Sequence, residues 1–377
     1  MLHPINPPSC VNELLALVDL QKRMLGFAEA NSVYSDAAFK TFVPTEFVDW
    51  LVDLKVNGRK DAKKVAADLL KELGEYVNDT VKFPSAEKSQ VLADFVSDQE
   101  YYAQIDNPIF EFSLLPNKSI THEKASVLLV KFYALLGEGY PSALVGHQSG
   151  TESFSKIKVV DGFIEKNPGI AHVCPCCDNP FTDTIRTING QGYTLEHYFP
   201  KSVYPSICLH PFNLIPMCRF CNDRKGAVDP LNPLPSLVRI PYTEIFHPIS
   251  KSVRAMADLC FSSNSAMLTS MEFVAKNPPP TYENSIEAYK IMYQIPDRWN
   301  KSWTKVLRKT EVYLKSTFKR YKNQQLDEAV LDEIVVETIA DLEEYFGSEY
   351  LNYPAAKWLK WAQANKREDI KHFLVVQ

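Results

Sequence analysis

The sequence has no excess of positive charge. Its 377 residues include 41 lysines and arginines against 46 aspartates and glutamates, which gives a formal net charge of −5. Because the overall field does not attract nucleic acid, any surface that binds phosphate must be a local one. The chain also has no repeat of fixed period and no low-complexity tract. Its length allows two or three ordinary globular units.

Several functional classes are excluded by what is missing. No apolar run reaches the length of a membrane span, and the first residues, MLHPINPPS, lack the basic and apolar regions of a signal peptide. We therefore expect a cytoplasmic protein. The sequence contains no Gly-x-x-x-x-Gly-Lys-Ser/Thr loop, so we do not expect it to hydrolyse ATP itself.

Half of the eight cysteines stand in two Cys-x-x-Cys pairs, Cys174/Cys177 and Cys218/Cys221. Two such pairs have the spacing of a tetrahedral structural Zn²⁺ site, which in a cytosolic chain is a better interpretation than disulfides. Cys176 could begin the first pair in place of Cys174, but the usual Cys-Pro-x-Cys spacing favours Cys174. The short segment around the pairs has little apolar core, so we expect it to need the metal to fold.

The segment between the pairs predicts two strands and a helix. Residues 193–199 are rich in β-branched and aromatic side chains, residues 212–216 follow after a proline-containing turn, and residues 218–225 fit the start of a helix. Glu196 and His197 lie on the first strand. A carboxylate, an imidazole and amide side chains held together are suited to a second, hard cation that acts on phosphate.

The order Cys-x-x-Cys, Glu-His, Asn, Cys-x-x-Cys-Asn and Lys resembles the HNH endonucleases, the ββα-metal nucleases with a four-cysteine zinc site. The resemblance covers residues 173–229 and not the flanks. It implies a ββα fold, and it implies that Glu196 and Asn222 hold a catalytic Mg²⁺ or Mn²⁺. It also implies that His197 is the general base, that Asn213 orients this histidine or its loop, and that Lys225 occupies a position where the family often has a basic residue.

The flanks predict helices, so the expected fold class is mainly α with a small embedded α+β module. Residues 1–150 form a helical region that serves as scaffold or partner surface, residues 151–250 the zinc-stapled module, and residues 251–377 a second helical region. Apolar periodicity in the N-terminal region predicts helices over residues 9–31, 47–54, 61–77, 86–96 and 122–136.

Residues 298–322 have the clearest amphipathic pattern, which predicts one helix with an aromatic face and a basic face. The basic face could follow several phosphates of a nucleic acid. Alternatively, the acidic residues within 327–344 neutralise it. The candidate nucleic-acid-binding residues are Lys301, Lys305, Arg308, Lys315 and Lys319.

The leading hypothesis is a metal-dependent endonuclease that hydrolyses phosphodiester bonds of DNA or RNA. An HNH module within long helical flanks is similar in style to nucleases encoded beside ATPases in bacterial anti-phage systems, of the Septu or retron-associated type. That similarity implies an antiviral role and an ATPase partner. The alternative is a non-catalytic, zinc-stabilised nucleic-acid-binding or adaptor protein, although such a protein has no use for the set Glu196, His197 and Asn222.

Overall fold

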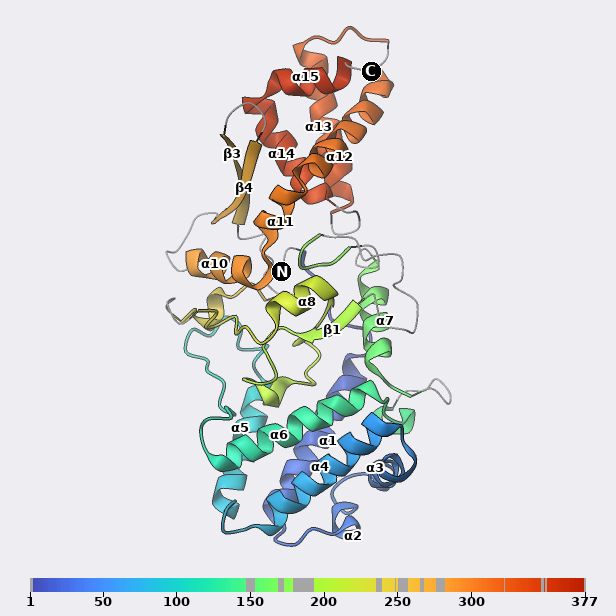
Figure 1. Cartoon of the computed structure of the whole chain (residues 1–377), viewed down its shortest axis with the longest axis vertical. Helices are drawn as coiled ribbons and strands as arrows, with labels where there is room; N and C mark the ends of the chain where they lie inside the picture. Colours follow the sequence, from blue (N-terminus) through green and yellow to red (C-terminus); the bar gives the residue numbers. More distant parts are fainter. Residues whose placement is uncertain are drawn as a thin grey trace.

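A computed structural model of the chain describes residues 3–146, 153–168, 173–178, 193–234, 239–247, 249, 257–264, 268–275, 282–321, 323–346, 349 and 351–375. The molecule is elongated (Figure 1). The N-terminal helices form one end, the C-terminal helices form the other, and the segment with the Cys-x-x-Cys pairs lies between them. No helix among the described residues is long and apolar enough to cross a membrane.

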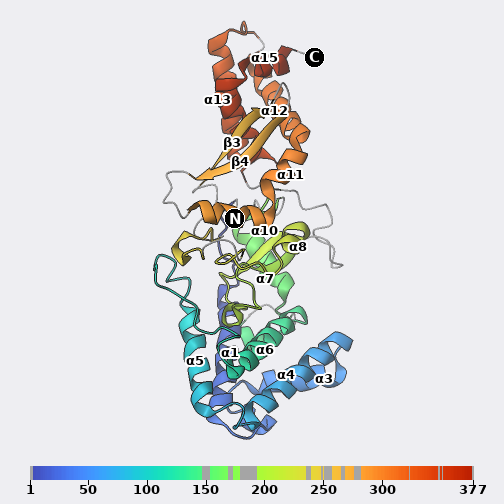
Figure 2. The ribbon, with the colours of Figure 1, turned by 60° about the vertical axis from the view of Figure 1, so that its left-hand side comes forward.

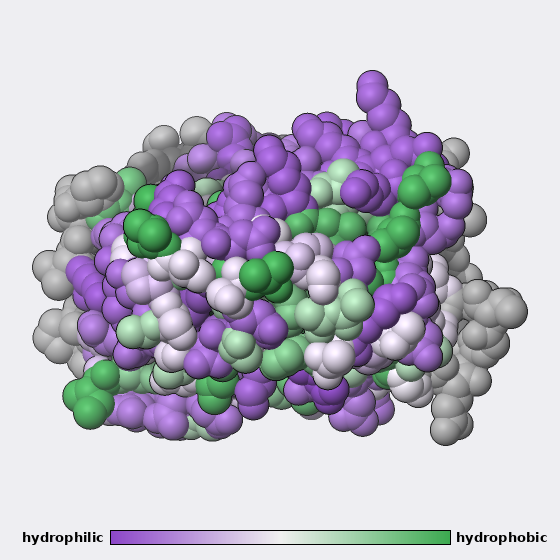
Figure 3. All heavy atoms as spheres, turned by 90° about the horizontal axis from the view of Figure 1, so that it is seen from below, coloured by the Kyte–Doolittle hydropathy of each residue, from purple (hydrophilic) through white to green (hydrophobic). Residues whose placement is uncertain are grey.

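The N-terminal region is helical, as the sequence predicts. Its helices are α1 (Val11–Ala30), α2 (Asp36–Phe39), α3 (Thr45–Asn57), α4 (Lys60–Asn78), α5 (Ser85–Gln99) and α6 (Ile120–Ala134). Helix α1 packs against α5, and α4 packs against α3 and α6. The helix α6 begins where the Ser119 hydroxyl accepts the N–H of His122, an N-cap that satisfies an otherwise orphan donor. Seen end-on, this region is mostly hydrophilic, with hydrophobic residues in small groups (Figure 3).

The middle of the chain contains the expected strand, strand and helix. After α7 (Lys156–Lys166) come β1 (Tyr193–His197), β2 (Leu214–Cys218) and α8 (Arg219–Lys225). The two strands pair antiparallel, with Tyr193 opposite Cys218 and His197 opposite Leu214. A two-stranded ribbon is marginally stable alone. Here it packs against α7 and α8, and Leu214, Ile215 and Met217 of β2 are fully buried.

The loop between β1 and β2 is fixed by the N-terminal region. Asp98 at the end of α5 accepts a 2.6 Å hydrogen bond from the Ser206 hydroxyl, and the Gln99 amide donates to the Ser206 carbonyl at 2.8 Å. The Cys208 thiol donates to the Leu129 carbonyl of α6 at 3.4 Å. The module is therefore built on the N-terminal helices.

The C-terminal region contains a β-hairpin that the sequence analysis did not predict. Its elements are β3 (Ala257–Asn264), β4 (Leu268–Ala275), α10 (Tyr282–Tyr293), α11 (Ile295–Lys301), α12 (Trp303–Phe318), α13 (Glu328–Glu344), α14 (Asn352–Asn365) and α15 (Arg367–Val375). Strands β3 and β4 pair antiparallel and lie beside α12 (Figure 2), and β3 contacts α14. Leu259 and Phe261 are buried while Cys260 is exposed, and Met271 and Phe273 are buried while Glu272 is exposed. This alternation is the two-residue period of a half-buried strand.

The prediction of a single helix over residues 298–322 is wrong. The helical path is interrupted at Ser302, whose φ and ψ are −103° and 17°. The Ser302 N–H donates to the carbonyls of Arg298 and Trp299 at 3.1 and 3.0 Å. The break separates two buried tryptophans, so that Trp299 contacts Phe273 and Trp303 contacts Trp358. Tertiary packing of the indoles overrides the continuous helical period. A 3₁₀ turn follows α12, and Lys322 lies outside the described residues.

Candidate metal centre and His197 site

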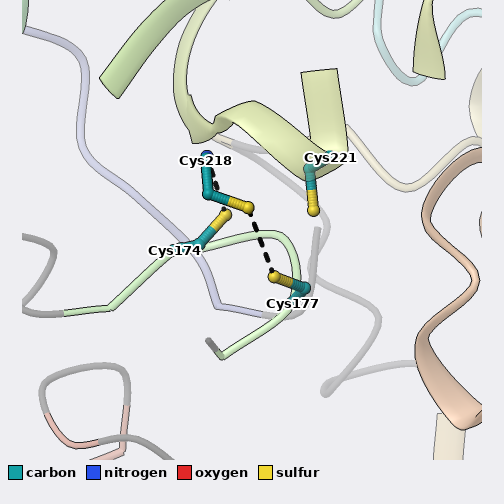
Figure 4. Close-up of side chains that lie close together, drawn as sticks. All are labelled: Cys174, Cys177, Cys218 and Cys221. Carbon is teal, nitrogen blue, oxygen red and sulfur yellow. Dashed lines mark hydrogen bonds between the residues drawn. The ribbon is translucent and has the colours of Figure 1, made fainter. Parts of the chain in front are cut away.

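Four cysteine sulfurs meet at the junction of the module with the C-terminal region (Figure 4). The Sγ atoms of Cys174, Cys177, Cys218 and Cys221 all lie within 4.8 Å of one another, and those of Cys177 and Cys218 are 3.8 Å apart. Zinc–sulfur bonds of about 2.3 Å place the corners of a tetrahedron roughly 3.8 Å apart. The cluster therefore has the dimensions of a four-cysteine zinc site, and the four predicted ligands are the ones that the fold brings together.

The first pair lies on a tight turn that the chain's N-terminus holds. The Cys174 carbonyl accepts the N–H groups of Cys177 and Asp178 at 3.2 and 2.9 Å. Asp178 has a φ of 57°, a left-handed conformation that aspartate tolerates better than most residues. The Asp178 carboxylate lies 2.8 Å from Nε2 of His3, and the His3 N–H donates to the Pro175 carbonyl at 3.0 Å.

The second pair joins β2 to α8 and contacts α11. The Cys218 N–H donates to Cys174 Sγ at 3.3 Å, a bond that partly neutralises a thiolate. Arg298 of α11 donates to Cys221 Sγ at 3.7 Å, and its guanidinium carbon lies 3.9 Å from the centre of the Phe220 ring. The sulfur cluster thus links the C-terminal region to the module.

Cys176, the alternative start of the first pair, is buried but is not one of the four clustered sulfurs. Its carbonyl accepts a 2.6 Å hydrogen bond from the Tyr289 hydroxyl of α10. The choice of Cys174 over Cys176 that the Cys-Pro-x-Cys spacing favoured agrees with the structure. Cys176 instead helps to dock α10 on the turn.

His197 ends β1 and is only 2 % exposed. Its ring meets the Tyr133 ring of α6 edge-on, with the centroids 4.4 Å apart, and its Nε2 lies 2.9 Å from the Cys208 carbonyl oxygen. Since a carbonyl oxygen carries no proton, Nε2 is the protonated donor, and in the neutral ring Nδ1 keeps its lone pair. Burial, together with the charges of Lys201 and Lys225, holds the pKa of His197 well below its usual value. The imidazole is therefore neutral at physiological pH and able to accept a proton at Nδ1.

Asn213 is fully buried and closes the loop between the strands. Its Nδ2 donates to the carbonyls of Phe199 and Ile207, both at 3.1 Å, and its Oδ1 accepts the Phe199 N–H at 2.7 Å. The residue bonds the loop that contains Cys208, and so it positions the imidazole through that loop. Among the described residues, the Asn213 side chain makes its hydrogen bonds to this loop and none to the His197 ring.

Glu196 and Asn222 lie half-buried on β1 and α8. Burial raises the pKa of Tyr133 and the Glu196 carboxylate raises it further, while burial lowers the pKa of Lys225 to about 8 and Glu196 opposes that change. Glu196 therefore lies near Tyr133, which contacts the His197 ring, and near Lys225, which lowers the pKa of His197. Within the described ranges, neither the Glu196 carboxylate nor the Asn222 amide has an ion pair or side-chain hydrogen bond.

Three residues of this site were missed by the sequence analysis: Tyr133, Lys156 and Lys201. Tyr133 and Lys156 belong to α6 and α7, far from the motif in the sequence, and no local pattern points to them. The Lys201 ammonium lies 5.3 Å from the centre of the Tyr133 ring, and its position shortly after His197 was the one available signal. Lys225, which the motif did indicate, is 2 % exposed.

The predicted basic face of α11 and α12 is only partly neutralised. Lys315 is paired with Glu311 at 2.8 Å, and the acidic helix α13 pairs with Arg320 through Glu337 and Asp341, both at 3.0 Å. Four of the five predicted contact residues are exposed and have no ion pair within the described part of the chain; these are Lys301, Lys305, Arg308 and Lys319.

Comparison with models of protein families, with curated proteins and with solved structures finds no match to this chain. A fold alone does not determine an activity. The function must therefore be inferred from the side chains of the two centres, the sulfur cluster and the group around His197.

Proposed function

We propose that the protein is a metal-dependent endonuclease of the HNH type that hydrolyses phosphodiester bonds of nucleic acid. The observation that carries the proposal is the state of His197. It is neutral because it is buried among cations, and its hydrogen bond to Cys208 keeps the proton on Nε2. A general base needs a neutral ring with a free lone pair in a fixed orientation, and His197 meets both conditions.

The side chains around His197 have distinct roles in this proposal. Nδ1 of His197 takes a proton from the attacking water and can return it to solvent. Glu196 and Asn222 hold a divalent cation, which when bound stabilises charge on the phosphate and the leaving oxygen. Lys225 places a positive charge near the same carboxylate, where it attracts the substrate phosphate. Asn213 keeps the loop that orients the imidazole.

The sulfur cluster has a structural role in the proposal. Cys174 and Cys177 come before the strands, and Cys218 and Cys221 come at the junction of β2 and α8. A Zn²⁺ ion bound by all four thiolates fixes α8, and with it Asn222, relative to β1. An antiviral role and an ATPase partner are further parts of the proposal that rest on resemblance alone.

A non-catalytic nucleic-acid-binding or adaptor protein is the second candidate. The exposed, unneutralised side chains on the basic face of α11 and α12, among them Lys305 and Arg308, favour it. Such a protein would bind nucleic acid without any requirement for His197. The two candidates therefore differ in whether replacing His197 changes the products.

The deciding experiment incubates the purified, zinc-loaded protein with supercoiled plasmid, single-stranded DNA and total RNA. Each substrate is tested with Mg²⁺, with Mn²⁺ and without added cation, and the products are separated on gels. We expect cation-dependent cleavage of at least one substrate by the wild type and none by His197→Gln. Equal cleavage by both proteins would refute the assignment of the base, and binding without cleavage by the wild type would favour the second candidate.

A further inference from the structure

Three lysines from separate elements gather around the Tyr133 ring and Glu196. Lys156 is the first residue of α7, and its ammonium lies 4.7 Å from the ring centre of Tyr133. Lys201 follows β1, and its ammonium lies 5.3 Å from the same ring centre. Lys225 ends α8. Figure 1 shows β1 between α7 and α8, and contacts join both helices to this strand.

The charge of Lys201 acts on the other two ammonium groups. Burial lowers the pKa of Lys156 and the Lys201 charge lowers it further, while Glu196 opposes the change. Burial lowers the pKa of Lys225 to about 8, and Lys201 adds to this effect against the opposing Glu196. Lys156 and Lys201 share the Tyr133 ring, and the Lys201 charge acts on both of the other lysines. The three lysines therefore form one cluster.

No carboxylate neutralises this cluster by direct contact. Within the described residues, none of Lys156, Lys201 and Lys225 has an ion pair, and Lys225 is 2 % exposed. Burying an unpaired charge is costly unless an anion compensates it. All three cations lie near Glu196, while Glu138 acts only on Lys156 and Asp229 only on Lys225, without ion pairs. The face of the Tyr133 ring attracts two of the ammonium groups, so they stay together without an anion.

The arrangement favours an extended anion with several charges. The lysines come from α7, from the loop after β1 and from α8, so they approach from different sides. A lysine ammonium acts as a point charge and does not require the planar geometry that a carboxylate offers to arginine. A chain of phosphodiester groups presents one negative charge per nucleotide and can meet such separated cations in succession.

We propose that Lys156, Lys201 and Lys225 form one binding site for consecutive phosphate groups of a nucleic-acid backbone that passes His197. The proposal deepens the nuclease function and takes its ligand class from it. It makes the N-terminal helical region part of the substrate site, because α6 supplies Tyr133 and α7 supplies Lys156. The region is then more than a scaffold.

The test measures how binding depends on salt. Zinc-loaded, full-length protein is titrated, without divalent cation, into a fluorescein-labelled DNA duplex and into a labelled RNA strand, and anisotropy is followed at several salt concentrations. The slope of log K against log salt is negative. Replacing Lys156 or Lys201 by Gln should make it shallower by about 0.9 on the duplex and by about 0.7 on the single strand. At 0.1 M salt this corresponds to a roughly tenfold loss of affinity.

The matched control is Lys166→Gln, which removes the same charge from an exposed position on α7. It should keep the wild-type slope. Lys156→Arg retains the charge and should restore the slope that Lys156→Gln loses. Thermal unfolding of each variant confirms that the fold is retained. Slopes of Lys156→Gln and Lys201→Gln equal to the control, or no binding of either nucleic acid by the wild type, would overturn the proposal.

Two further measurements separate this proposal from its alternatives. If inorganic pyrophosphate binds through the three lysines while oligonucleotide binding is independent of them, the ligand is a free phosphate compound and the backbone assignment is wrong. Cleavage is measured in parallel with Mg²⁺ and Mn²⁺. Lysine-dependent binding without cleavage would refute the nuclease function and support the phosphate site. Cleavage with lysine-independent binding would support the nuclease function and refute the phosphate site.

Discussion

Nε2 of His197 donates a 2.9 Å hydrogen bond to the backbone carbonyl of Cys208. The Cys208 thiol in turn donates to the carbonyl of Leu129 on α6, and the Gln21 amide of α1 lies 3.5 Å from the same sulfur. The orientation of the imidazole therefore depends on helices outside the module that carries the motif.

The first prediction concerns His197→Gln. The Gln amide can donate to the Cys208 carbonyl in place of Nε2, but it cannot take a proton from water. We expect cleavage to fall roughly 10²- to 10⁴-fold, with unchanged zinc content and nearly unchanged stability. The measurements are single-turnover cleavage, metal analysis and urea unfolding.

The matched variant His197→Ala should lose the same activity and also stability. It leaves the buried Cys208 carbonyl without a donor, which costs about 1–3 kcal/mol. Glutamine as active as histidine would show that the ring is structural. Equal stability of the two variants would show that the bond to Cys208 has little effect on folding.

Much of the fold follows from local sequence patterns. The N-terminal helices were predicted from periodicity and the four sulfur ligands from spacing. The order of β1, β2 and α8 was predicted from residue composition and from the resemblance. The β3–β4 hairpin also has a local signal, the alternation around Phe261 and Phe273, which the helical character of the surrounding region obscured. The break at Ser302 has none, since it results from the packing of Trp299 and Trp303 on different partners.

The candidate site was predictable only where the motif extends. Glu196, His197 and Asn213 are recognised by their order between the cysteine pairs. Tyr133 reaches the site because its ring contacts His197 of β1, and Lys156 because α7 packs against β1. Tertiary structure alone therefore reveals both residues. Neither has a neighbour in the sequence that indicates its role.

The second prediction concerns Asn213→Ala. The change removes three side-chain hydrogen bonds to the loop and takes their partner from the N–H and carbonyl of Phe199, while the Ile207 carbonyl keeps the N–H of His210. At about 1 kcal/mol per bond, we expect a loss of roughly 3 kcal/mol in the free energy of unfolding. Cleavage should fall as well, because the loop that orients His197 is released. Urea unfolding and cleavage rates measure the two effects.

Asn365→Ala is the control for this change. Asn365 is exposed at the end of α14 and makes one hydrogen bond, to the Trp361 carbonyl. We expect it to change stability by less than about 0.5 kcal/mol and to leave cleavage unaltered. If Asn213→Ala behaved like this control, the proposed loop-positioning role would be wrong.

The third prediction concerns metal content. We expect one zinc per chain, retained by Cys260→Ser and Cys176→Ser and lost by Cys218→Ser. Cys260 is an exposed cysteine of β3 and Cys176 is buried outside the group of four sulfurs, so both test the choice of ligands. Loss of zinc should also release α11, because Arg298 contacts Cys221, and limited proteolysis should then cut near the second pair. Retention of zinc by Cys218→Ser with loss in Cys176→Ser would mean a different set of ligands.

The last prediction is that Lys225 lowers the stability of the protein. Burial lowers the pKa of Lys225 from 10.5 to about 8, so between these values the unfolded chain binds a proton that the folded chain does not. The free energy of unfolding therefore rises with pH across this window. Below pH 8 the buried Lys225 charge destabilises the fold by its full amount. The difference between the two pKa values corresponds to roughly 3 kcal/mol.

Lys225→Met removes the charge and keeps an unbranched stem, so the zinc-loaded variant should be more stable than the wild type at pH 7. The gain should shrink as the pH approaches 10. Lys201→Met removes the same charge from a half-buried position, and we expect it to change stability by less than about 1 kcal/mol. Urea unfolding at pH 7 and pH 9.5 measures both. If Lys225→Met is less stable at pH 7, Lys225 has a structural role. If the variant is more stable but binds nucleic acid poorly, Lys225 contributes to phosphate binding and not to folding.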